Sequence, residues 1–174
     1  ALRARVAAAE GRGIAPAARR AGGRAVVGDL EVDPAMRALV ATALGELGRS
    51  FVVDRAALER LAGERGTVVL GDAEGTGARP PGAAEAEAAR RAAGRFGGGL
   101  VGEGIRADPT GAVRRLLARW AWAPSLAEAG GLAAILPPGW RVAARGEGAF
   151  HARQLQHRGS ACRDRRPARS RRGV

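Results

Sequence analysis

The chain has 174 residues and a formal net charge of +12, which arginine alone provides because the sequence contains no lysine. The absence of lysine excludes a Walker-type phosphate loop, which needs Gly-Lys-Ser/Thr, and it also excludes Schiff-base chemistry. Cys162 is the single cysteine, so neither a disulfide framework nor a cysteine-based metal site can form within one chain. No stretch is long and apolar enough to predict a membrane-spanning helix.

The positive charge is concentrated at the two ends of the chain. Residues 1–25 contain six arginines and one acid, residues 153–174 contain eight arginines and one acid, and the interior is neutral. If the two ends meet in space, they form a basic patch that attracts nucleic acid through counterion release. The alternative to a binding patch is that these arginines simply lie on solvent-exposed faces. For the last dozen residues this alternative is the better explanation of the positive charge. The candidate DNA-binding residues are Arg19, Arg20, Arg24, Arg153 and Arg158.

Two stretches of the sequence predict the same order of elements. Residues 26–34 and 100–109 each predict a short strand that runs through an acidic turn into a helix, with Asp as N-cap and Pro as first helical residue. An apolar-periodic helix, a hydrophobic run, a second capped helix, a glycine turn and a closing strand then follow in both. The predicted ranges are 35–47, 51–53, 54–62, 66 and 67–70 in the first copy, and 110–120, 122–123, 125–136, 139 and 140–144 in the second. This order indicates a duplicated α/β unit.

Composition predicts the segments that flank the two units. Residues 83–95 are rich in alanine, glutamate and arginine and have almost no large apolar face, so they predict an exposed bridging helix. Residues 149–156 add one more strand or return to helix. The predicted parts are a basic lead-in or coiled-coil stub, a first subdomain, a linker helix, a second subdomain and a disordered basic tail, at residues 1–25, 26–78, 79–96, 97–157 and 158–174.

No stretch of the sequence predicts an active site. Residues 97–102 formally match G-x-G-x-x-G, but they precede a strand instead of following one, so they indicate a glycine-rich entry to a tightly packed strand. His151 and His157 have only Cys162 and Asp164 near them in sequence as further zinc ligands. A zinc site is therefore a remote alternative, and we expect both histidines to lie at the surface. No G-x-S-x-G sequence is present. We therefore predict no catalytic residues, no metal and no cofactor.

The first unit resembles the hinge domain of SMC (structural maintenance of chromosomes) proteins. Leu30-Glu31-Val32-Asp33-Pro34, a helix ending in Ala43-Leu44-Gly45, and Phe51-Val52-Val53-Asp54 are similar to that family's "I-E-V-D-P", "A-L-G" and "V-V-V" motifs. The stretch 56–67 looks like the family's second helix and strand, and 139–147 is similar to its closing "G-x-R-V-V-T-x-D-G" strand and turn. Together the resemblance covers roughly residues 11–159.

The resemblance implies a mixed α/β (α+β) fold with two pseudo-symmetric subdomains, each of short strands and two helices. It implies a homodimer formed by pairing sheet edges, with a dimer interface at Gly146, Gly148 and Gly159. It also implies nonspecific DNA contact, a role in chromosome segregation and condensation, a cytoplasmic, nucleoid-associated location, no membrane, and the rest of an ATP-binding SMC chain as partner. Two alternatives remain open, namely a small nucleotide- or metabolite-binding α/β enzyme and a plain basic nucleic-acid-binding protein.

Overall fold

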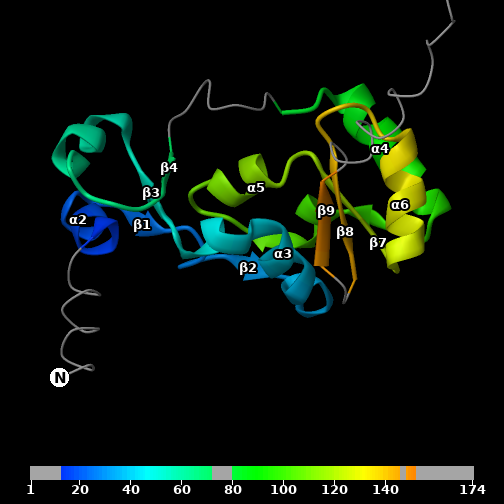
Figure 1. Ribbon diagram of the computed structural model, residues 1–174, viewed down its shortest axis with the longest axis horizontal. Helices are drawn as coiled ribbons and strands as arrows, with labels where there is room; N and C mark the ends of the chain where they lie inside the picture. The colour runs from blue at the N-terminus through cyan, green and yellow to red at the C-terminus, as the bar shows by residue number, and fades with distance from the viewer. Residues whose placement is uncertain (1–12, 72–79, 146–147, 152–174) are drawn as a thin grey trace, which may run out of the picture.

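A computed structural model of the chain describes residues 13–71, 80–145 and 148–151, which form a mixed α/β structure with several small sheets (Figure 1). The predicted fold class is confirmed. The helices, with 3₁₀ segments labelled η, are α2 (Ile14–Arg20), η1 (Pro34–Met36), α3 (Arg37–Leu44), η2 (Gly45–Arg49), η3 (Arg55–Leu61), α4 (Ala83–Arg95), η4 (Val101–Gly104), α5 (Ala112–Leu116) and α6 (Leu126–Ile135). The strands are β1 (Arg24–Ala25), β2 (Glu31–Val32), β3 (Phe51–Val53), β4 (Val68–Leu70), β5 (Gly99–Leu100), β6 (Ile105–Ala107), β7 (Trp120–Ala123), β8 (Arg141–Ala144) and β9 (Gly148–His151).

The two larger sheets have the same arrangement of strands. In the first sheet, β1 lies antiparallel to β3, and β3 lies parallel to β4. In the second, β5 lies antiparallel to β7, β7 lies parallel to β8, and β9 adds an antiparallel strand beyond β8. A helical segment connects each parallel pair, as such a crossover requires: η3 joins β3 to β4, and α6 joins β7 to β8.

The duplication extends to single hydrogen bonds. The Gly23 N–H donates to the Ala18 carbonyl at 2.7 Å, and at the same sequence interval the Gly98 N–H donates to the Ala93 carbonyl at 2.9 Å. Immediately before these residues, Gly22 and its counterpart Gly97 both have positive φ, +87° and +69°, where glycine is favoured. The repeat therefore includes the helix and glycine turn that precede β1 and β5, in addition to the elements predicted for each unit.

The two units join through a pair of short strands and a shared core. β2 of the first unit pairs antiparallel with β6 of the second, with Val32 opposite Ile105. The Asp33 N–H extends this pairing by donating to the Gly104 carbonyl at 2.8 Å. The core cluster around this junction contains buried side chains from both units: Val26, Leu39, Val40, Ala43, Leu44, Val52, Val101, Ile105, Ala112, Val113, Leu117, Trp120 and Ala143.

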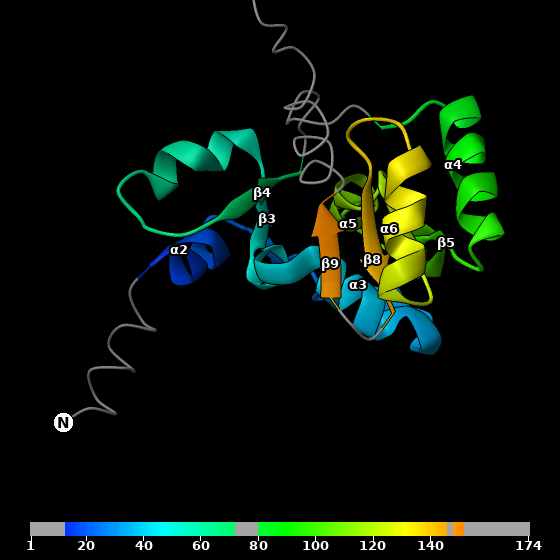
Figure 2. The same ribbon diagram turned by 45° about the vertical axis from the view of Figure 1, so that its right-hand side comes forward.

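Helix α4 is part of the second core, so the prediction of an exposed bridging helix is wrong. Its boundaries match the prediction, but Ala89 and Ala93 are 1% and 0% exposed. The two alanines belong to the same core cluster as residues of β7, β8 and α6 (Figure 2). Alanine has no bulk beyond Cβ, so the helix approaches the sheet closely and needs no large apolar face.

The turn and cap of the first unit are close to the prediction. Asp33 accepts a hydrogen bond from the Ala35 N–H at 2.9 Å, and Pro34 is the first residue of η1, so this cap is confirmed. Val26 and Val27, predicted as strand, lie in a turn between β1 and β2, because the Gly28 N–H donates back to the Ala25 carbonyl.

The main helix of the second unit is shorter than predicted. It covers Ala112–Leu116, and Trp120, predicted as its last inward residue, begins β7 instead. Its N-cap is Gly111 with φ +64°, whereas Asp108 accepts from the Arg114 N–H at 2.8 Å. Asp108 therefore accepts a hydrogen bond from the first turn of the helix, although it lies three residues before the N-cap residue Gly111.

Three further predictions can be compared with the structure. The predicted helix at residues 54–62 is the 3₁₀ segment η3. Ser125 caps α6 as predicted, accepting from the Glu128 N–H at 3.4 Å. The sequence predicts either a strand or a helix for residues 149–156. Residues 148–151 form β9, so the strand is correct for 149–151. The basic tail at 158–174 lies outside the described residues.

Candidate dimer interface and basic surface

Strands β4 and β9 each end a sheet. Among the described residues, β4 has a strand neighbour only in β3, and β9 has one only in β8. An edge strand presents unpaired backbone N–H and C=O groups along its free side, which can pair with a strand of another chain. The strands β1 and β5 end the same two sheets on the other side. Since β4 and β9 belong to different units, they are two different candidate surfaces for pairing with another chain.

The backbone of β4 alternates between its neighbour β3 and the open side. The Gly71 N–H donates to the Val53 carbonyl at 2.9 Å, so Gly71 faces β3. Since both backbone groups of a residue in a parallel strand point to the same side, Val69 also faces β3, whereas Val68 and Leu70 direct theirs outward. All three side chains of β4 are only half-buried, which leaves apolar surface at this edge.

One of the three glycines predicted at the dimer interface lies at such an edge. Gly148 is the first residue of β9 and lies opposite Ala144 of β8. Gly146 and Gly159 lie outside the described residues. The structure thus places one of these glycines on an edge strand, and the interface role of all three stays a prediction.

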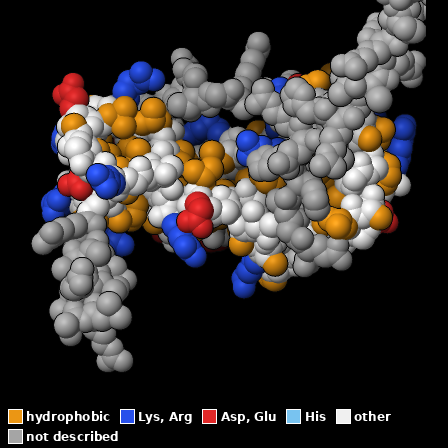
Figure 3. All heavy atoms as spheres, in the orientation of Figure 1, with side chains coloured by type: hydrophobic (Ala, Val, Ile, Leu, Met, Phe, Trp, Pro, Cys, Tyr) orange, Lys and Arg blue, Asp and Glu red, His pale blue; other side chains and the backbone are white. Residues whose placement is uncertain are grey.

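Three of the five predicted DNA-binding arginines are described, and they belong to the adjacent elements α2 and β1. Arg19 and Arg20 are exposed in the last turn of α2, and the Arg19 guanidinium lies 5.3 Å from the centre of the Phe51 ring. Arg24 forms an exposed ion pair with Asp29 at 2.5 Å. Arg153 and Arg158 lie outside the described residues, so the meeting of the two chain ends stays a prediction. Figure 3 shows basic side chains dispersed over one face, several beside acidic ones.

Two arginine–tryptophan stacks were missed by the sequence analysis. The Arg145 guanidinium lies 4.4 Å from the centre of the Trp122 ring, and that of Arg141 lies 5.5 Å from the Trp120 ring. Both tryptophans are on β7 and Arg141 is on the neighbouring β8, where it lies directly opposite Trp120. Such contacts are worth about 0.5–1 kcal/mol at exposed sites. Trp120 and Trp122 alternate along β7 and so share a face, which the sequence analysis missed because it placed Trp120 in the preceding helix and only Trp122 in the hydrophobic run.

A polar cluster fastens helix α4 to the second sheet. Arg119 donates two hydrogen bonds to the carboxylate of Glu85, one of them at 3.1 Å, and the fully buried Trp140 donates its indole N–H to Glu85 at 3.0 Å. The Trp140 indole N–H, followed by the Arg119 guanidinium, lowers the pKa of Glu85 from its ordinary value of 4.5. The carboxylate therefore satisfies the polar atom of a core tryptophan, which is a structural role.

Two separate polar contacts connect the two units. Arg106 of β6 donates to the Asp33 carboxylate at 2.7 Å, and this bond, followed by the one from the Ala35 N–H, lowers the pKa of Asp33. Arg115 of α5 donates to the carbonyl of Gly71, just after β4, at 2.6 Å. The second unit thereby holds the end of the candidate dimer edge in the first.

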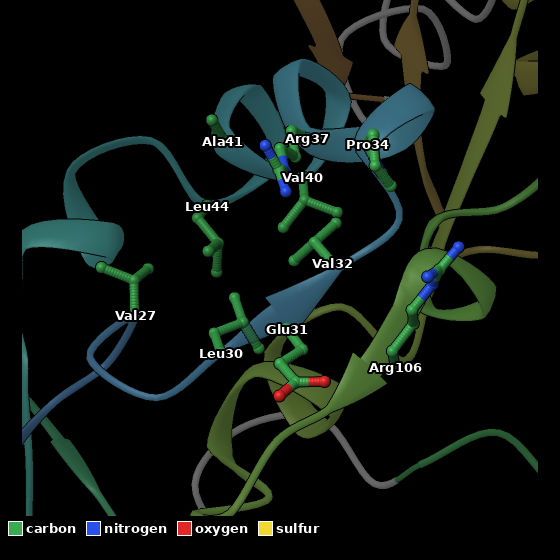
Figure 4. Close-up of a pocket in the computed structure, with 10 residues that line it drawn as sticks. All are labelled: Val27, Leu30, Glu31, Val32, Pro34, Arg37, Val40, Ala41, Leu44 and Arg106. Carbon is green, nitrogen blue, oxygen red and sulfur yellow. The ribbon is translucent and has the colours of Figure 1, made fainter.

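A cavity of about 510 Å³ opens between β2 and α3 (Figure 4). Most of its lining is aliphatic, and its charged groups are Glu31, Arg37 and Arg106. No serine, cysteine or histidine is among its lining residues, so it offers no nucleophile of these types. The described part of the chain contains no group of three or more His, Cys, Asp and Glu that could hold a metal ion. No helix within these ranges is long and apolar enough to cross a membrane.

The sequence matches no protein-family model and no curated protein sequence. The structure is similar to the crystal structure of an asymmetric dimer of the SMC hinge domain from Geobacillus stearothermophilus. The TM-score is 0.59 at 24% sequence identity, over 81% of this chain and 58% of that one. The chain has an SMC-hinge-like fold. It spans less than two thirds of the hinge structure it matches, and the resemblance found in the sequence is confirmed at the level of the fold.

Proposed function

We propose that this SMC-hinge-like chain is a dimerisation module of an SMC-type chromosome segregation and condensation protein. The observation that carries the proposal is the combination of the hinge-like fold with an open sheet edge in each unit. The similar protein crystallised as a dimer, which supports self-association of this one. The remainder of an ATP-binding SMC chain and a location at the nucleoid belong to the same proposal.

In the proposed dimer, β4 of one protomer pairs with β9 of the other. A two-fold axis repeats this contact, so the dimer contains two β4–β9 pairs. No β4 or β9 edge then remains free to pair with a third chain and form a fibre. The outward backbone groups of Val68 and Leu70 would supply the hydrogen bonds of β4. The half-buried side chains of this strand would supply the apolar area, while Gly148 would allow close approach at β9.

A substitution at the first residue of β4 tests this pairing. Val68→Pro removes an N–H that faces away from β3, and proline is tolerated at the first position of an edge strand, so the protomer should keep its fold. We expect the dimer to dissociate at concentrations where the parent chain stays dimeric. Val68→Thr, which retains the N–H and the branched shape, is the matched control. Light scattering coupled to size exclusion over a concentration series measures both, and a parent chain that is monomeric at high micromolar concentration contradicts the proposal.

The proposal includes nonspecific DNA contact through Arg19, Arg20 and Arg24, together with Arg153 and Arg158 beyond the described residues. The charge of +12 and its concentration at the chain ends support it. Replacing Arg19 and Arg20 by glutamine should weaken DNA binding for all sequences alike. It should also lower the slope of log K against log salt by about 1 for each phosphate that the variant no longer neutralises. Fluorescence anisotropy with labelled duplex DNA measures both quantities.

Truncation after Gly159 separates this function from that of a plain basic nucleic-acid-binding protein. A hinge module should keep its dimerisation and part of its DNA affinity without residues 160–174, because neither depends on the tail alone. A protein whose affinity resides in the tail would lose nearly all DNA binding. The enzyme alternative receives no support from the cavity between β2 and α3, because its lining contains no serine, cysteine or histidine.

A further inference from the structure

The two units can be compared position by position at their main helices. Two pairs of consecutive inward-facing residues occur in each helix region, with the same spacing between the pairs. They are Leu39, Val40, Ala43 and Leu44 in the first unit, and Ala112, Val113, Leu116 and Leu117 in the second. This alignment places Ala41 of α3 at the position that Arg114 occupies in α5. The strands β2 and β6 align through the Asp-Pro that follows each, so Leu30 corresponds to Ile105, and the connection from strand to helix is two residues shorter in the second unit.

In the second unit, Arg114 covers the strand beneath its helix. Its Nη2 donates to the Ile105 carbonyl at 2.6 Å and lies 3.3 Å from the Arg106 carbonyl. A charged donor on a backbone carbonyl makes a stronger bond than a neutral one. The second unit therefore closes the space between its strand and its helix with its own guanidinium.

In the first unit the same space is open. Ala41 ends in a methyl group and cannot donate a hydrogen bond, and Ala41 and Leu30 both line the 510 Å³ groove (Figure 4). The apolar walls are Leu30, Val32, Val40 and Leu44, with Val27 46% exposed at one end. By the alignment of β2 with β6, the Leu30 carbonyl is the counterpart of the Ile105 carbonyl, to which the head of Arg114 donates in the second unit. The stem of an arginine can lie on apolar surface such as these walls.

The charges at the rim add a second partner for a cation. Glu31 is exposed, lines the groove, and forms no ion pair with any residue in the described ranges. The other two charged groups of the lining are arginines: Arg106, which is bound to Asp33, and Arg37, which is exposed on α3. An incoming guanidinium would meet a backbone carbonyl, the Glu31 carboxylate and an aliphatic wall, and these contacts must outweigh repulsion from Arg37.

We propose that this groove binds an arginine side chain, flanked by apolar residues, from a segment of a partner protein. The arginine takes the place that Arg114 has in the second unit: it donates to the Leu30 carbonyl, pairs with Glu31 and lays its stem on Val32 and Leu44. The site lies on β2 and α3, apart from the edges β4 and β9, and does not rest on the proposed dimer.

A short peptide tests the proposal on the unmodified full chain. The probe is acetyl-Leu-Arg-Leu-amide, and its control replaces arginine by citrulline, which has the same shape without the charge. Titration followed by amide NMR shifts should show binding of the arginine peptide at residues 27–44, at least tenfold tighter than the citrulline peptide. Glu31→Gln should weaken the arginine peptide at least threefold. Equal affinity for the two peptides, or no binding at millimolar concentration, overturns the proposal, and neither result depends on a variant that folds.

A second test fills the groove from within. Ala41→Arg copies the arrangement of the second unit, so it should raise the thermal midpoint and weaken the arginine peptide at least tenfold. Ala38→Arg is the matched control, because Ala38 is exposed on the same helix but does not line the groove, and it should leave the peptide affinity unchanged. If both variants bind the peptide as the parent does, the groove is not its site and the proposal is wrong.

Discussion

Gly98 should be among the least replaceable residues of the chain. A Cβ added there would lie 1.8 Å from the carbonyl oxygen of Trp122 and 2.9 Å from its carbonyl carbon, so the contact is with backbone and cannot be relieved by rotating a side chain. Gly98→Ala must therefore push β5 away from β7, where Gly99 pairs with Trp122. Forced backbone shifts in packed regions cost about 1–3 kcal/mol, and we expect a loss of about 3 kcal/mol here.

Gly94→Ala makes the same chemical change where space is free. A Cβ on Gly94 has no atom outside its own helix within 4 Å, and the residue lies in α4, where alanine is favoured over glycine by up to about 1 kcal/mol. The two variants should thus differ by about 4 kcal/mol in the free energy of unfolding, measured by urea denaturation. A Gly98→Ala variant within 0.5 kcal/mol of the parent would refute the steric reasoning. Destabilisation by Gly94→Ala would show instead that the end of α4 tolerates no side chain.

Two further variants test the second unit. Because hydrogen bonds from Trp140 and Arg119 lower the pKa of Glu85, its carboxylate stabilises the fold above pH 4.5, and this contribution is lost as the pH falls through the folded-state pKa. Glu85→Gln should consequently lower the thermal midpoint at pH 7, and the difference from the parent should shrink as the pH falls below 4.5 and through the folded-state pKa. A pH-independent difference would contradict the assignment. Ser125→Ala removes the cap of α6 and should cost about 1 kcal/mol in urea denaturation, with Ser125→Asp, which can still accept the hydrogen bond, close to the parent.

Sequence reasoning succeeded where local signals and packing agree. The β-branched and aromatic run Phe51–Val53 is a buried strand with the predicted boundaries, and helix propensity located Ala83–Arg95 correctly. Sequence reasoning did not predict that α4 is partly buried. Hydrophobic periodicity is recognised from large side chains, whereas alanines on both the helix and the sheet make this contact. Small residues indicate close packing only once the opposing surface is known.

The second unit shows a different limit. Val113, Leu116, Leu117 and Trp120 have the spacing of one helical face, so the periodic pattern extends past the helix, which ends at Leu116. Trp120 joins a strand because β8 pairs with it from a distant part of the chain. Likewise, the open edges at β4 and β9 depend on which strands become neighbours. The resemblance to a known hinge implied that sheet edges pair, but the sequence did not indicate which strands form those edges.

The shared core implies that the two units unfold together. The cluster at the β2–β6 junction draws buried side chains from both, and Arg115 of the second unit bonds to Gly71 of the first. Trp120, Trp122 and Trp140 all lie in the second unit, and Trp120 belongs to the shared core, so tryptophan fluorescence follows the second unit and the junction, while far-UV circular dichroism follows both units throughout. We expect the two urea transitions to coincide, as in two-state unfolding. A circular dichroism change that precedes the fluorescence change would mean that the first unit melts separately, and the β2–β6 junction would then be a flexible joint instead of a common core.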